Sequence, residues 1–366
     1  MAKIAVIPGD GIGTEVVNQG VRVLECAGRL CGFTYTLKWF PFGAEHYLKT
    51  GEIFPVAAFD EIRTMDAILL GAIGDPRIET GLLERGVVGK LRWDLDLYVN
   101  LRPVVLYAPQ LTPLKNKGPE DINFIIVREN TEDSYLGLGG FVKKGTPDEV
   151  AILESIYTRK GVERIIRYAY ELCRKRNQKK KLTLCDKANA IPVHDLWRRV
   201  FREVGREYPD ITQDMAYVDA TAMWMVKNPE WFDVIVTTNM FGDILSDLGA
   251  MLQGGMGICA SGNIHPGKVS MFEPIHGSAP KYAGKNSASP IAAILSVSMM
   301  LHYLSEKLGP PYAAGGDLVE RSVAELFASG RIQDPSASSG INTDAIGDLV
   351  LEKMTAGRPA SAGTPA

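Results

Sequence analysis

Short apolar segments alternate with amphipathic helical patterns through most of this 366-residue chain, and this alternation limits the possible fold more than any other feature. We expect strands at 3–9, 67–74, 122–130, 181–187 and 232–239, and helices at 13–30 and 160–176. Strands that alternate with helices predict an α/β fold. In open α/β sheets, ligands bind at the carboxyl ends of the strands, where polar residues begin in this chain.

Composition limits the function. The length suits two domains better than one core. A net charge of -3 gives no basic field for nucleic acid or an anionic membrane. Five scattered cysteines without a C-x-x-C pair favour reduced thiols over a disulfide framework or a zinc site. With no signal-peptide pattern and no apolar run of membrane-spanning length, we expect a cytoplasmic protein that acts on a small molecule, without nucleic-acid or membrane partners.

Two aspartates four residues apart, Asp243 and Asp247, lie in the apolar segment TTNMFGDILSDLGAMLQGG (237–255). This spacing puts both carboxylates on one helical face, where like charges repel unless a cation lies between them. Carboxylate oxygens suit Mg²⁺ or Mn²⁺, and Asp219 in YVDATAM is a third candidate. The alternative is a surface helix with two solvated carboxylates.

Three arginines, Arg92, Arg102 and Arg128, lie near the ends of apolar segments. They could clamp a di- or tricarboxylate, because a guanidinium group binds carboxylate oxygens in a bidentate manner. Three unrelated surface salt bridges would give the same spacing. Lys187 directly follows an expected strand and could transfer protons, or it could be a solvated strand end. Tyr135, beside a glycine-rich turn, could act as an acid or be structural.

Two glycine-containing segments could hold a ligand. IPGDGIG (7–13) departs from the dinucleotide spacing G-x-G-x-x-G, so we expect a tight turn at which a ligand approaches the backbone. FEPIHGSAPKYAGKN (272–286) is expected to be a loop that holds a nucleotide. Its histidine, His276, is given no metal or base role.

Taken together and in order, IPGDGIG, LRWDLDLYVNLRP, VRENTED, DKANA, VDATAM, TTNMFGDILSDL and EPIHGSAPKYAGKN resemble the β-decarboxylating dehydrogenases. These enzymes include the isopropylmalate, isocitrate, homoisocitrate, tartrate and D-malate dehydrogenases. The resemblance covers about residues 3–354. It implies an enzyme that oxidises a (2R)-malate-type acid, transfers hydride to NAD or NADP, and releases CO₂ with the help of Mg²⁺ or Mn²⁺.

The resemblance also implies an architecture. An α/β, isopropylmalate-dehydrogenase-like, non-Rossmann fold is expected, with two domains around a large mixed sheet and a central cleft. Residues 1–101 and 256–354 would form the nucleotide-binding domain, and 102–255 the domain that binds substrate and metal and makes most of the dimer contact. Residues 355–366 would be a disordered tail. The expected assembly is a homodimer whose active sites are shared between the subunits.

For the site, the resemblance implies that Arg92, Arg102 and Arg128 bind the carboxylates of a small dicarboxylate substrate. Asp243 and Asp247 would bind the metal together with Asp219 of the partner subunit. Lys187 of the partner subunit would assist removal of the hydroxyl proton, and Tyr135 would protonate the carbon that loses CO₂. The residues expected at the cofactor are Ile12, Glu273, His276, Gly277, Ser278, Ala279, Lys281, Tyr282 and Ser289.

The cofactor-binding segment departs from the family's pattern. Lys281 and Tyr282 stand where NAD-using members often have an aspartate, and this pair suits the 2′-phosphate of NADP. Yet the stretch 332–350 lacks the tyrosine and arginine that usually complete a phosphate site, and Ser289 stands where asparagine is common. NAD and NADP therefore both remain open.

The segment LLERGVVGKLR (82–92) corresponds to the one that reads the third substituent of the acid in this family. Its apolar residues, Leu82, Leu83, Val87 and Val88, favour an isopropyl group over the extra carboxylate of isocitrate, and Gly89 leaves room for a bulkier group. Other segments, such as YVNLRPV, look close to the D-malate and tartrate dehydrogenases. 3-Isopropylmalate is the favoured substrate, followed by D-malate or tartrate and then by isocitrate-type acids.

Two non-enzymatic classes compete with this interpretation. A non-catalytic regulatory subunit would have lost the lysine, the tyrosine or the metal aspartates, none of which is lost here. A binding protein without turnover remains open.

Overall fold

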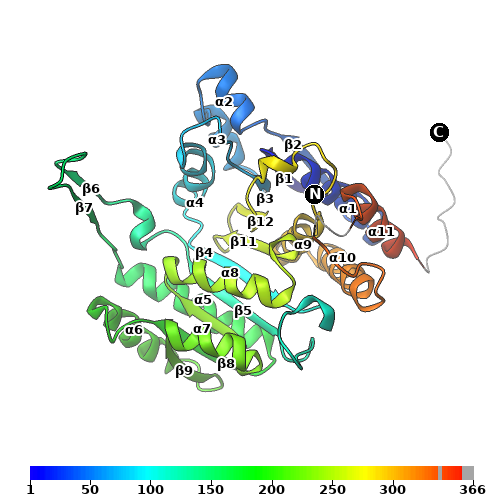
Figure 1. Cartoon of the computed structure of the whole chain (residues 1–366). Coiled ribbons are helices and arrows are strands. Elements are labelled where there is room, and N and C mark those ends of the chain that lie inside the picture. The colour runs from blue at the N-terminus through cyan, green and yellow to red at the C-terminus, as the bar shows by residue number, and fades with distance from the viewer. Residues whose placement is uncertain (337–339, 357–366) are drawn as a thin grey trace, which may run out of the picture.

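The computed structural model describes residues 1–336 and 340–356. A ten-stranded mixed sheet runs through the whole molecule in the order β2-β1-β3-β12-β11-β4-β5-β10-β8-β9, with helices packed on it (Figure 1). The strands are β1 (Ala2–Gly9), β2 (Tyr35–Trp39), β3 (Ala67–Ala72), β4 (Val99–Val105), β5 (Asn123–Glu129), β8 (Lys181–Asp186), β9 (Thr212–Tyr217), β10 (Val234–Thr237), β11 (Ala260–Ile264) and β12 (Ser270–Pro274).

The main helices are α1 (Gly13–Cys31), α2 (Ala44–Thr50), α3 (Val56–Ile62), α4 (Lys90–Asp94), α5 (Arg159–Arg176), α6 (Asp195–Gly205), α7 (Val218–Lys227), α8 (Asn239–Gln253), α9 (Ile291–Leu308), α10 (Pro310–Ala328) and α11 (Thr343–Thr355). The expected α/β class and the large mixed sheet are confirmed. The expected strands correspond to β1, β3, β5, β8 and β10, and the two expected helices to α1 and α5.

The centre of the sheet is antiparallel, which the strand-and-helix alternation did not predict. β2, β1, β3 and β12 are parallel to one another, and so are β5, β10, β8 and β9. Between these two groups, β11 and β4 pair antiparallel with each other and with their outer neighbours. The segment 272–274, expected to be part of a loop, forms the end of β12, because the pairing of Phe272 with β3 and β11 continues the sheet.

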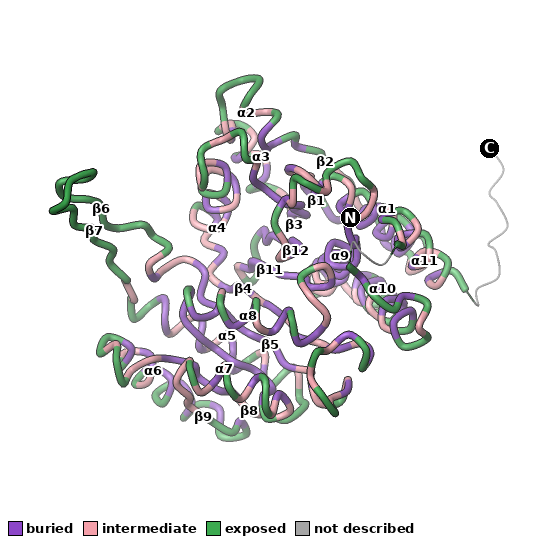
Figure 2. Tube along the Cα trace, viewed as in Figure 1, coloured by how far each residue is buried: buried purple, intermediate pink, exposed green. Residues whose placement is uncertain are grey.

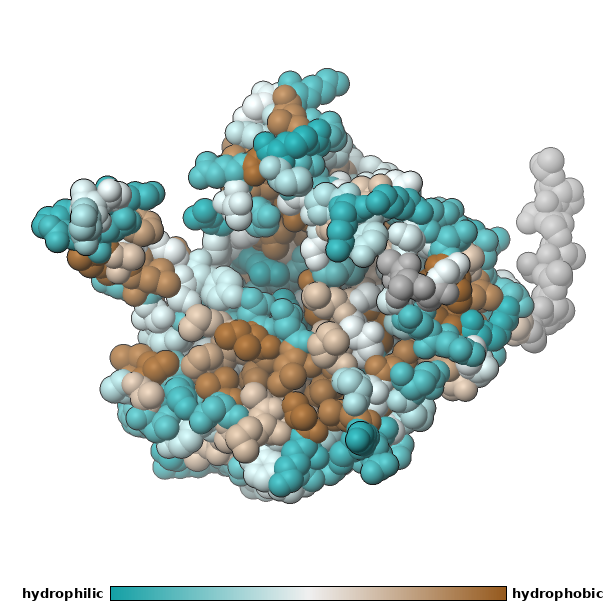
Figure 3. Space-filling view, in the orientation of Figure 1, coloured by the Kyte–Doolittle hydropathy of each residue, from teal (hydrophilic) through white to brown (hydrophobic). Residues whose placement is uncertain are grey.

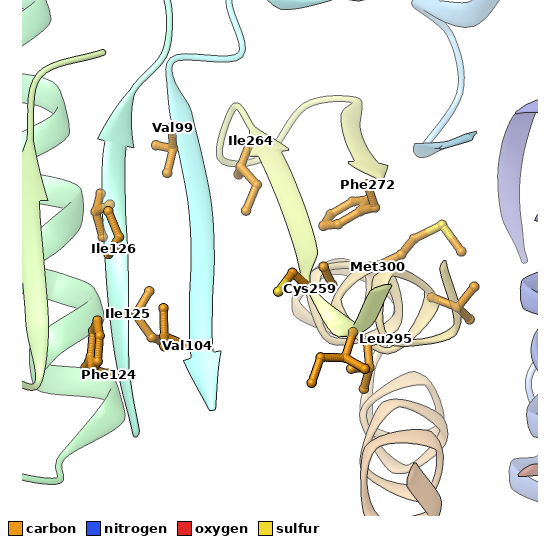
Figure 4. Packing of buried hydrophobic residues seen from close by; sticks show 14 of the residues in the cluster. Val99, Val104, Phe124, Ile125, Ile126, Cys259, Ile264, Phe272, Leu295 and Met300 are labelled. Atoms are coloured by element: carbon orange, nitrogen blue, oxygen red, sulfur yellow. The ribbon is translucent and has the colours of Figure 1, made fainter. Parts of the chain in front are cut away.

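One apolar core is continuous across the antiparallel centre. Helices α1, α9, α10 and α11 pack together on the side of β1, β3, β12 and β11, α5 and α6 pack near β8, and α8 lies against β4 and β5. Figure 4 shows side chains of this core from β4, β5, β11, β12 and α9 and from the residue just before β11: Val99, Val104, Phe124, Ile125, Ile126, Cys259, Ile264, Phe272, Leu295 and Met300. Helix α9 is apolar along most of its length because it is buried in this core.

A two-stranded hairpin, β6 (Gly139–Val142) with β7 (Val150–Leu153), projects from the body of the molecule and is exposed along its whole length (Figures 1 and 2). Within the described ranges, no helix is both long and apolar enough to cross a membrane. All five cysteines lie in the described part of the chain, and none of them forms a disulfide. Of the predicted disordered tail, residues 357–366 lie outside the described residues, whereas Thr355 is still the last residue of α11.

Candidate active site

Helix α8 carries the two aspartates and begins two residues after β10 ends. Its apolar residues Phe241 and Leu245 are buried, while the side chains of Asp243 and Asp247 are 36% and 63% exposed. Both carboxylates approach the same guanidinium group, since Nη1 of Arg102 lies 3.3 Å from Asp243 Oδ1 and 3.9 Å from Asp247 Oδ1. The i, i+4 spacing thus directs both carboxylates to one side, as expected from the sequence.

Two of the three arginines come from neighbouring strands under α8. Arg128 on β5 pairs across the ladder with Asn100 on β4, and Arg102 lies two residues further along β4 on the same face. Arg128 donates from Nη1 to Asp243, and Asn239 accepts from its Nε at 2.9 Å and its Nη2 at 2.7 Å. Sequence reasoning placed both arginines near segment ends, but Arg102 lies in the middle of β4.

The charges in this cluster shift each other's pKa values. Burial and the neighbouring charge of Arg102 together lower the pKa of Arg128 to about 9, although Asp243 opposes the change. Burial would raise the pKa of Asp243, but the guanidinium groups of Arg128 and Arg102 outweigh it, so this pKa is lowered. The pKa of Asp247 is raised, chiefly by burial. The cluster holds dense, opposed charge in a partly dry site, an arrangement more common at functional sites than at ordinary surfaces.

Tyr135 lies in the short 3₁₀-helix η3 (Asp133–Leu136) and reaches the same carboxylate. Its hydroxyl donates to Asp243 Oδ2 at 2.6 Å, and the guanidinium carbon of Arg128 lies 5.2 Å from the centroid of its ring. Burial, and then the hydrogen bond and charge of Asp243, raise the pKa of Tyr135 to about 12. The phenol is therefore protonated at neutral pH and can supply a proton.

Arg92, on α4, faces this cluster from the other half of the molecule. Its Nη2 donates to Glu273 Oε1 on β12 at 2.9 Å, and its Nε is buried without a hydrogen-bond partner. Its positive charge lowers the pKa values of Arg102 and Arg128, so the three guanidinium groups lie close enough to interact. An unpartnered buried donor among three cations is suited to an anionic ligand.

Lys187 and Asp219 contact each other and stand apart from the arginine cluster. Lys187 follows β8, and its Nζ lies 2.6 Å from Asp219 Oδ1 on α7. Across the residues that the structure describes, no group of three or more acidic, histidine or cysteine side chains converges as metal ligands. Asp219 therefore does not join Asp243 and Asp247 within one chain, and a shared metal site would need a second subunit.

Several of the residues expected at the cofactor lie where the 7–13 turn meets the 276–282 segment, among them Ile12, Ser278, Ala279 and Tyr282. Ile12 N donates to Ser278 O at 2.9 Å. Gly11 has a φ of 56°, and a Cβ on it would lie 2.0 Å from Ser278 O, so only glycine fits there. The close approach expected for a ligand is thus made by the protein's own backbone.

Other groups in and near the 276–282 segment could contact a ligand. The Nε2 atom of His276 is buried without a hydrogen-bond partner, while burial lowers the pKa of this histidine. Ala279 has a φ of 39°, a left-handed conformation that is strained for a non-glycine residue and is found most often at functional loops. Lys281 is exposed, with its Nζ 4.8 Å from the centroid of the Tyr282 ring. Gly277 is also exposed, whereas Ser289 is buried beside α9.

The segment before Arg92 forms a π-helical turn, η1 (Glu84–Gly89). It differs from the expected substrate pocket at its apolar residues and at Gly89. Leu83 and Val87 are 1% and 0% exposed and belong to a second apolar cluster, so they support the turn rather than face a ligand. A Cβ on Gly89 would lie 2.7 Å from the ring of Trp93, so the space expected for a bulky substrate group is occupied by an indole. Val88 is half-buried.

Sequence reasoning missed several polar residues that hold the site together. Asn239 binds Arg128, as described above, and Ser246 accepts from Arg102 Nη1 at 2.5 Å. Asn100 accepts from Arg102 Nε at 2.7 Å. Each carried a signal from spacing: Asn239 and Ser246 lie four residues before and three residues after Asp243 on one helix, and Asn100 lies two residues before Arg102 on one strand.

Figure 3 shows a hollow lined with hydrophilic residues between the part of the molecule that carries α2 to α4 and the part that carries α7 and α8. A cavity of about 860 Å³ lies elsewhere, between residues 63–66, the turn before β12 and the end of α9. It is lined by none of the arginines described above. The chemistry of the side chains, rather than the size of the cavity, identifies the candidate site.

Comparison with known proteins agrees with this geometry. The family model described as isocitrate/isopropylmalate dehydrogenase matches residues 3–350. A 3-isopropylmalate dehydrogenase of Thermobifida fusca is 47% identical over 356 residues, which cover 96% of this chain and 97% of that protein.

Two solved structures have the same fold. The isocitrate dehydrogenase of Methylococcus capsulatus has a TM-score of 0.85 and 37% identity, and the match covers 97% of this chain and 99% of the other. A β-decarboxylating dehydrogenase of Thermococcus kodakarensis has a TM-score of 0.76 and 34% identity, with 97% and 96% covered.

Proposed function

The chain belongs to the isocitrate/isopropylmalate dehydrogenase family, and from this premise we propose that it catalyses the oxidative decarboxylation of 3-isopropylmalate. The observation that carries the proposal is the convergence of Arg102, Arg128 and Tyr135 on Asp243, with Arg92 facing them. Three cations suit an acid with two carboxylates, and a protonated phenol suits the last proton transfer.

The residues present fit both groups that the family implies. Asp243 and Asp247 offer hard oxygen ligands one helical turn apart, and Asp247 has only a 3.9 Å ion pair among the described residues. The buried, unpartnered Nε2 of His276 and the adjacent backbone suit a nicotinamide dinucleotide. When bound, the cofactor accepts a hydride and the divalent cation acts as a Lewis acid toward the substrate oxygens.

The side chains bind the substrate and transfer the protons. Arg92, Arg102 and Arg128 bind and orient the two carboxylates of the acid. Lys187 of the partner subunit, as its neutral amine, would assist removal of the proton from the C2 hydroxyl while the C2–H bond breaks and its hydride leaves for the nicotinamide, which gives a 2-oxo acid. The C3–carboxylate bond then breaks, CO₂ leaves with its bonding electrons retained on C3, and Tyr135 donates its proton to that carbon.

Lys187 and Asp219 lie apart from Asp243 within one chain, so these roles need two subunits. We propose a homodimer in which Lys187 and Asp219 of each chain complete the site of its partner. Two exposed apolar surfaces support the proposal. The first is the projecting β6–β7 hairpin, with Phe141 59% and Leu153 64% exposed. The second covers α7 and α8 and the residues just after them, and Figure 3 shows an apolar patch on this side. Its exposed residues are Met223, Val226, Trp231, Met240, Ile244, Met251 and Met256.

We also propose the division into two domains, 1–101 with 256–354 and 102–255. The strand order supports it, because β2, β1, β3, β12 and β11 fall in the first part, and β5, β10, β8 and β9 fall in the second. β4 crosses the proposed boundary. The candidate site would then lie between the domains, where a relative movement can open and close it.

Substrate selectivity tests the proposed function. With Mg²⁺ and NAD or NADP, kcat/KM for 3-isopropylmalate is expected to exceed that for D-malate by about tenfold or more, because one buried apolar group contributes roughly 1–3 kcal/mol. Absorbance of the reduced nicotinamide gives the rates for 3-isopropylmalate, D-malate, tartrate and isocitrate. A higher kcat/KM for any of the other three acids would overturn the proposed substrate, and no turnover with any acid would overturn the proposed activity.

Cofactor choice gives a separate prediction. Lys281→Asp is expected to lower the NADP/NAD ratio of kcat/KM by about tenfold, because a charge-assisted hydrogen bond to the 2′-phosphate is replaced by repulsion. The exposed Lys285, in the same segment, provides the control Lys285→Asp, which should change the ratio less. An unchanged ratio in Lys281→Asp would remove Lys281 from phosphate recognition.

A further inference from the structure

A row of buried amides crosses the antiparallel centre of the sheet and connects the cofactor side of the site to its acid-binding side. Asn263 on β11 lies directly opposite Asn100 on β4, which in turn lies opposite Arg128 on β5. On the other side, Ser261, two residues before Asn263, lies opposite Glu273 on β12. Residues that face each other across a ladder share a face, so all of these side chains lie on one face of the sheet.

Asn263 uses both ends of its amide in this row. Its Nδ2 donates to Glu273 Oε1 at 2.7 Å. Its Oδ1 accepts from Asn100 Nδ2 at 2.8 Å and from Asn130 Nδ2 at 3.0 Å. The opposite orientation of the amide would set its oxygen against the carboxylate and its NH₂ against two donors, so the contacts allow one orientation only.

A guanidinium group is hydrogen-bonded at each end of this row of side chains. Glu273 Oε1 also accepts from Arg92 Nη2 at 2.9 Å, and Asn100 Oδ1 accepts from Arg102 Nε at 2.7 Å. The connection therefore runs Arg92, Glu273, Asn263, Asn100, Arg102. Asn100 and Asn263 are 0% exposed, so water does not compete for these hydrogen bonds.

We propose that Asn263 is a positioning residue that sets the separation between Arg92 and Arg102 and thereby the fit of the two carboxylates of the acid. The proposal rests on the function proposed above, in which these arginines bind the substrate. Arg92 comes from α4 and Arg102 from β4, and Asn263 hydrogen-bonds to the partner of each, Glu273 and Asn100.

Asn263→Leu tests the proposal, because leucine has a similar shape and removes both ends of the amide. Asn100 keeps its bonds to Ser261 at 3.0 Å and to Arg102, and Asn130 keeps its bond to Leu97 O at 2.8 Å. The fold therefore keeps most of its contacts. Because hydrogen bonds to charged groups are the stronger ones, the Kd and KM for 3-isopropylmalate are expected to rise about tenfold to a hundredfold, with kcat changed much less.

Ser270→Ala is the matched control. Ser270 is 0% exposed, lies on β12 three residues before Glu273, and its hydroxyl hydrogen-bonds to backbone atoms of the 265–270 turn, away from the row of amides. It should lower thermal stability to a similar extent as Asn263→Leu but leave the Kd and KM for the acid unchanged. A Glu273→Gln background provides a second check, since Asn263→Leu should there raise the Kd by much less than in the wild type.

The Kd is measured by calorimetry with 3-isopropylmalate and Mg²⁺, which does not require turnover. If the wild type binds the acid but Asn263→Leu leaves its Kd and KM unchanged, or if Ser270→Ala raises them equally, the positioning role is wrong while the proposed function stands. If the wild type binds the acid without turning it over, the activity is wrong and the Kd still decides the role of Asn263. If the wild type does not bind the acid, both proposals are overturned.

Discussion

Asp243→Asn is expected to lower kcat by roughly 10²–10³-fold or more, because charge stabilisation at the reacting atoms is commonly the largest single contribution to catalysis. The substitution removes the negative charge that faces Arg128 and Arg102 and one of the two carboxylates available to a cation. The asparagine oxygen can still accept from the Tyr135 hydroxyl, so the local hydrogen bonding is partly retained.

The same substitution should lower stability without unfolding the protein. Removing one partner of a fully buried ion pair costs about 3–5 kcal/mol, and the cost should be smaller here because the Asp243 side chain is 36% exposed. Asp195→Asn, which removes the exposed ion pair with Arg199 on α6, is the control and should change neither kcat nor the melting temperature appreciably.

Steady-state kinetics, calorimetric titration with Mn²⁺ in the presence of the acid, and thermal denaturation separate these effects. A variant with near-normal kcat and unchanged Mn²⁺ affinity would remove Asp243 from the metal site. Loss of the cooperative melting transition would instead assign the residue a structural role.

Lys187→Ala is expected to lower kcat by about 10²–10⁴-fold, the usual effect of removing a group that transfers a proton in the reaction. The proposal assigns the ε-amino group to the active site of the partner subunit. Within its own chain, Lys187 contacts Asp219 and is absent from the cluster around Asp243.

Mixing two inactive variants tests this assignment. In a heterodimer of Lys187→Ala with Asp243→Asn chains, one site receives both defects and the other receives neither, if Lys187 acts in the partner's site. Random reassociation of equal amounts should therefore restore about a quarter of the wild-type rate. If Lys187 acts in its own chain, every site keeps one defect and no activity returns.

Much of the site could be predicted from local spacing. Residues 243 and 247 lie one helical turn apart, and that spacing alone directs two carboxylates to one side of α8. Strand periodicity likewise places Asn100 and Arg102 on one face of β4. The family resemblance, rather than spacing, supplied the roles of Lys187, Asp219 and the segment around His276.

The rest depends on contacts between residues far apart in the chain. Arg128 and Asn239 are separated by 111 positions, and their contact requires β5 to pair with β10 before α8 begins. Asn263 carries no local signal, because its role arises only from the antiparallel pairing of β11 with β4. The space at Gly89 is different, because the residue that fills it, Trp93, lies only four positions further along the chain and is thus a local contact.

The most direct test of the central claim measures both products of one reaction. Protein, Mg²⁺, NAD or NADP and 3-isopropylmalate are combined, and reduced nicotinamide and CO₂ are quantified together over time. The proposed function predicts that both products form in equal amounts and that a chelator stops both. Reduced nicotinamide without CO₂ would contradict the decarboxylation, and the absence of both products with every malate-type acid would contradict the enzyme itself.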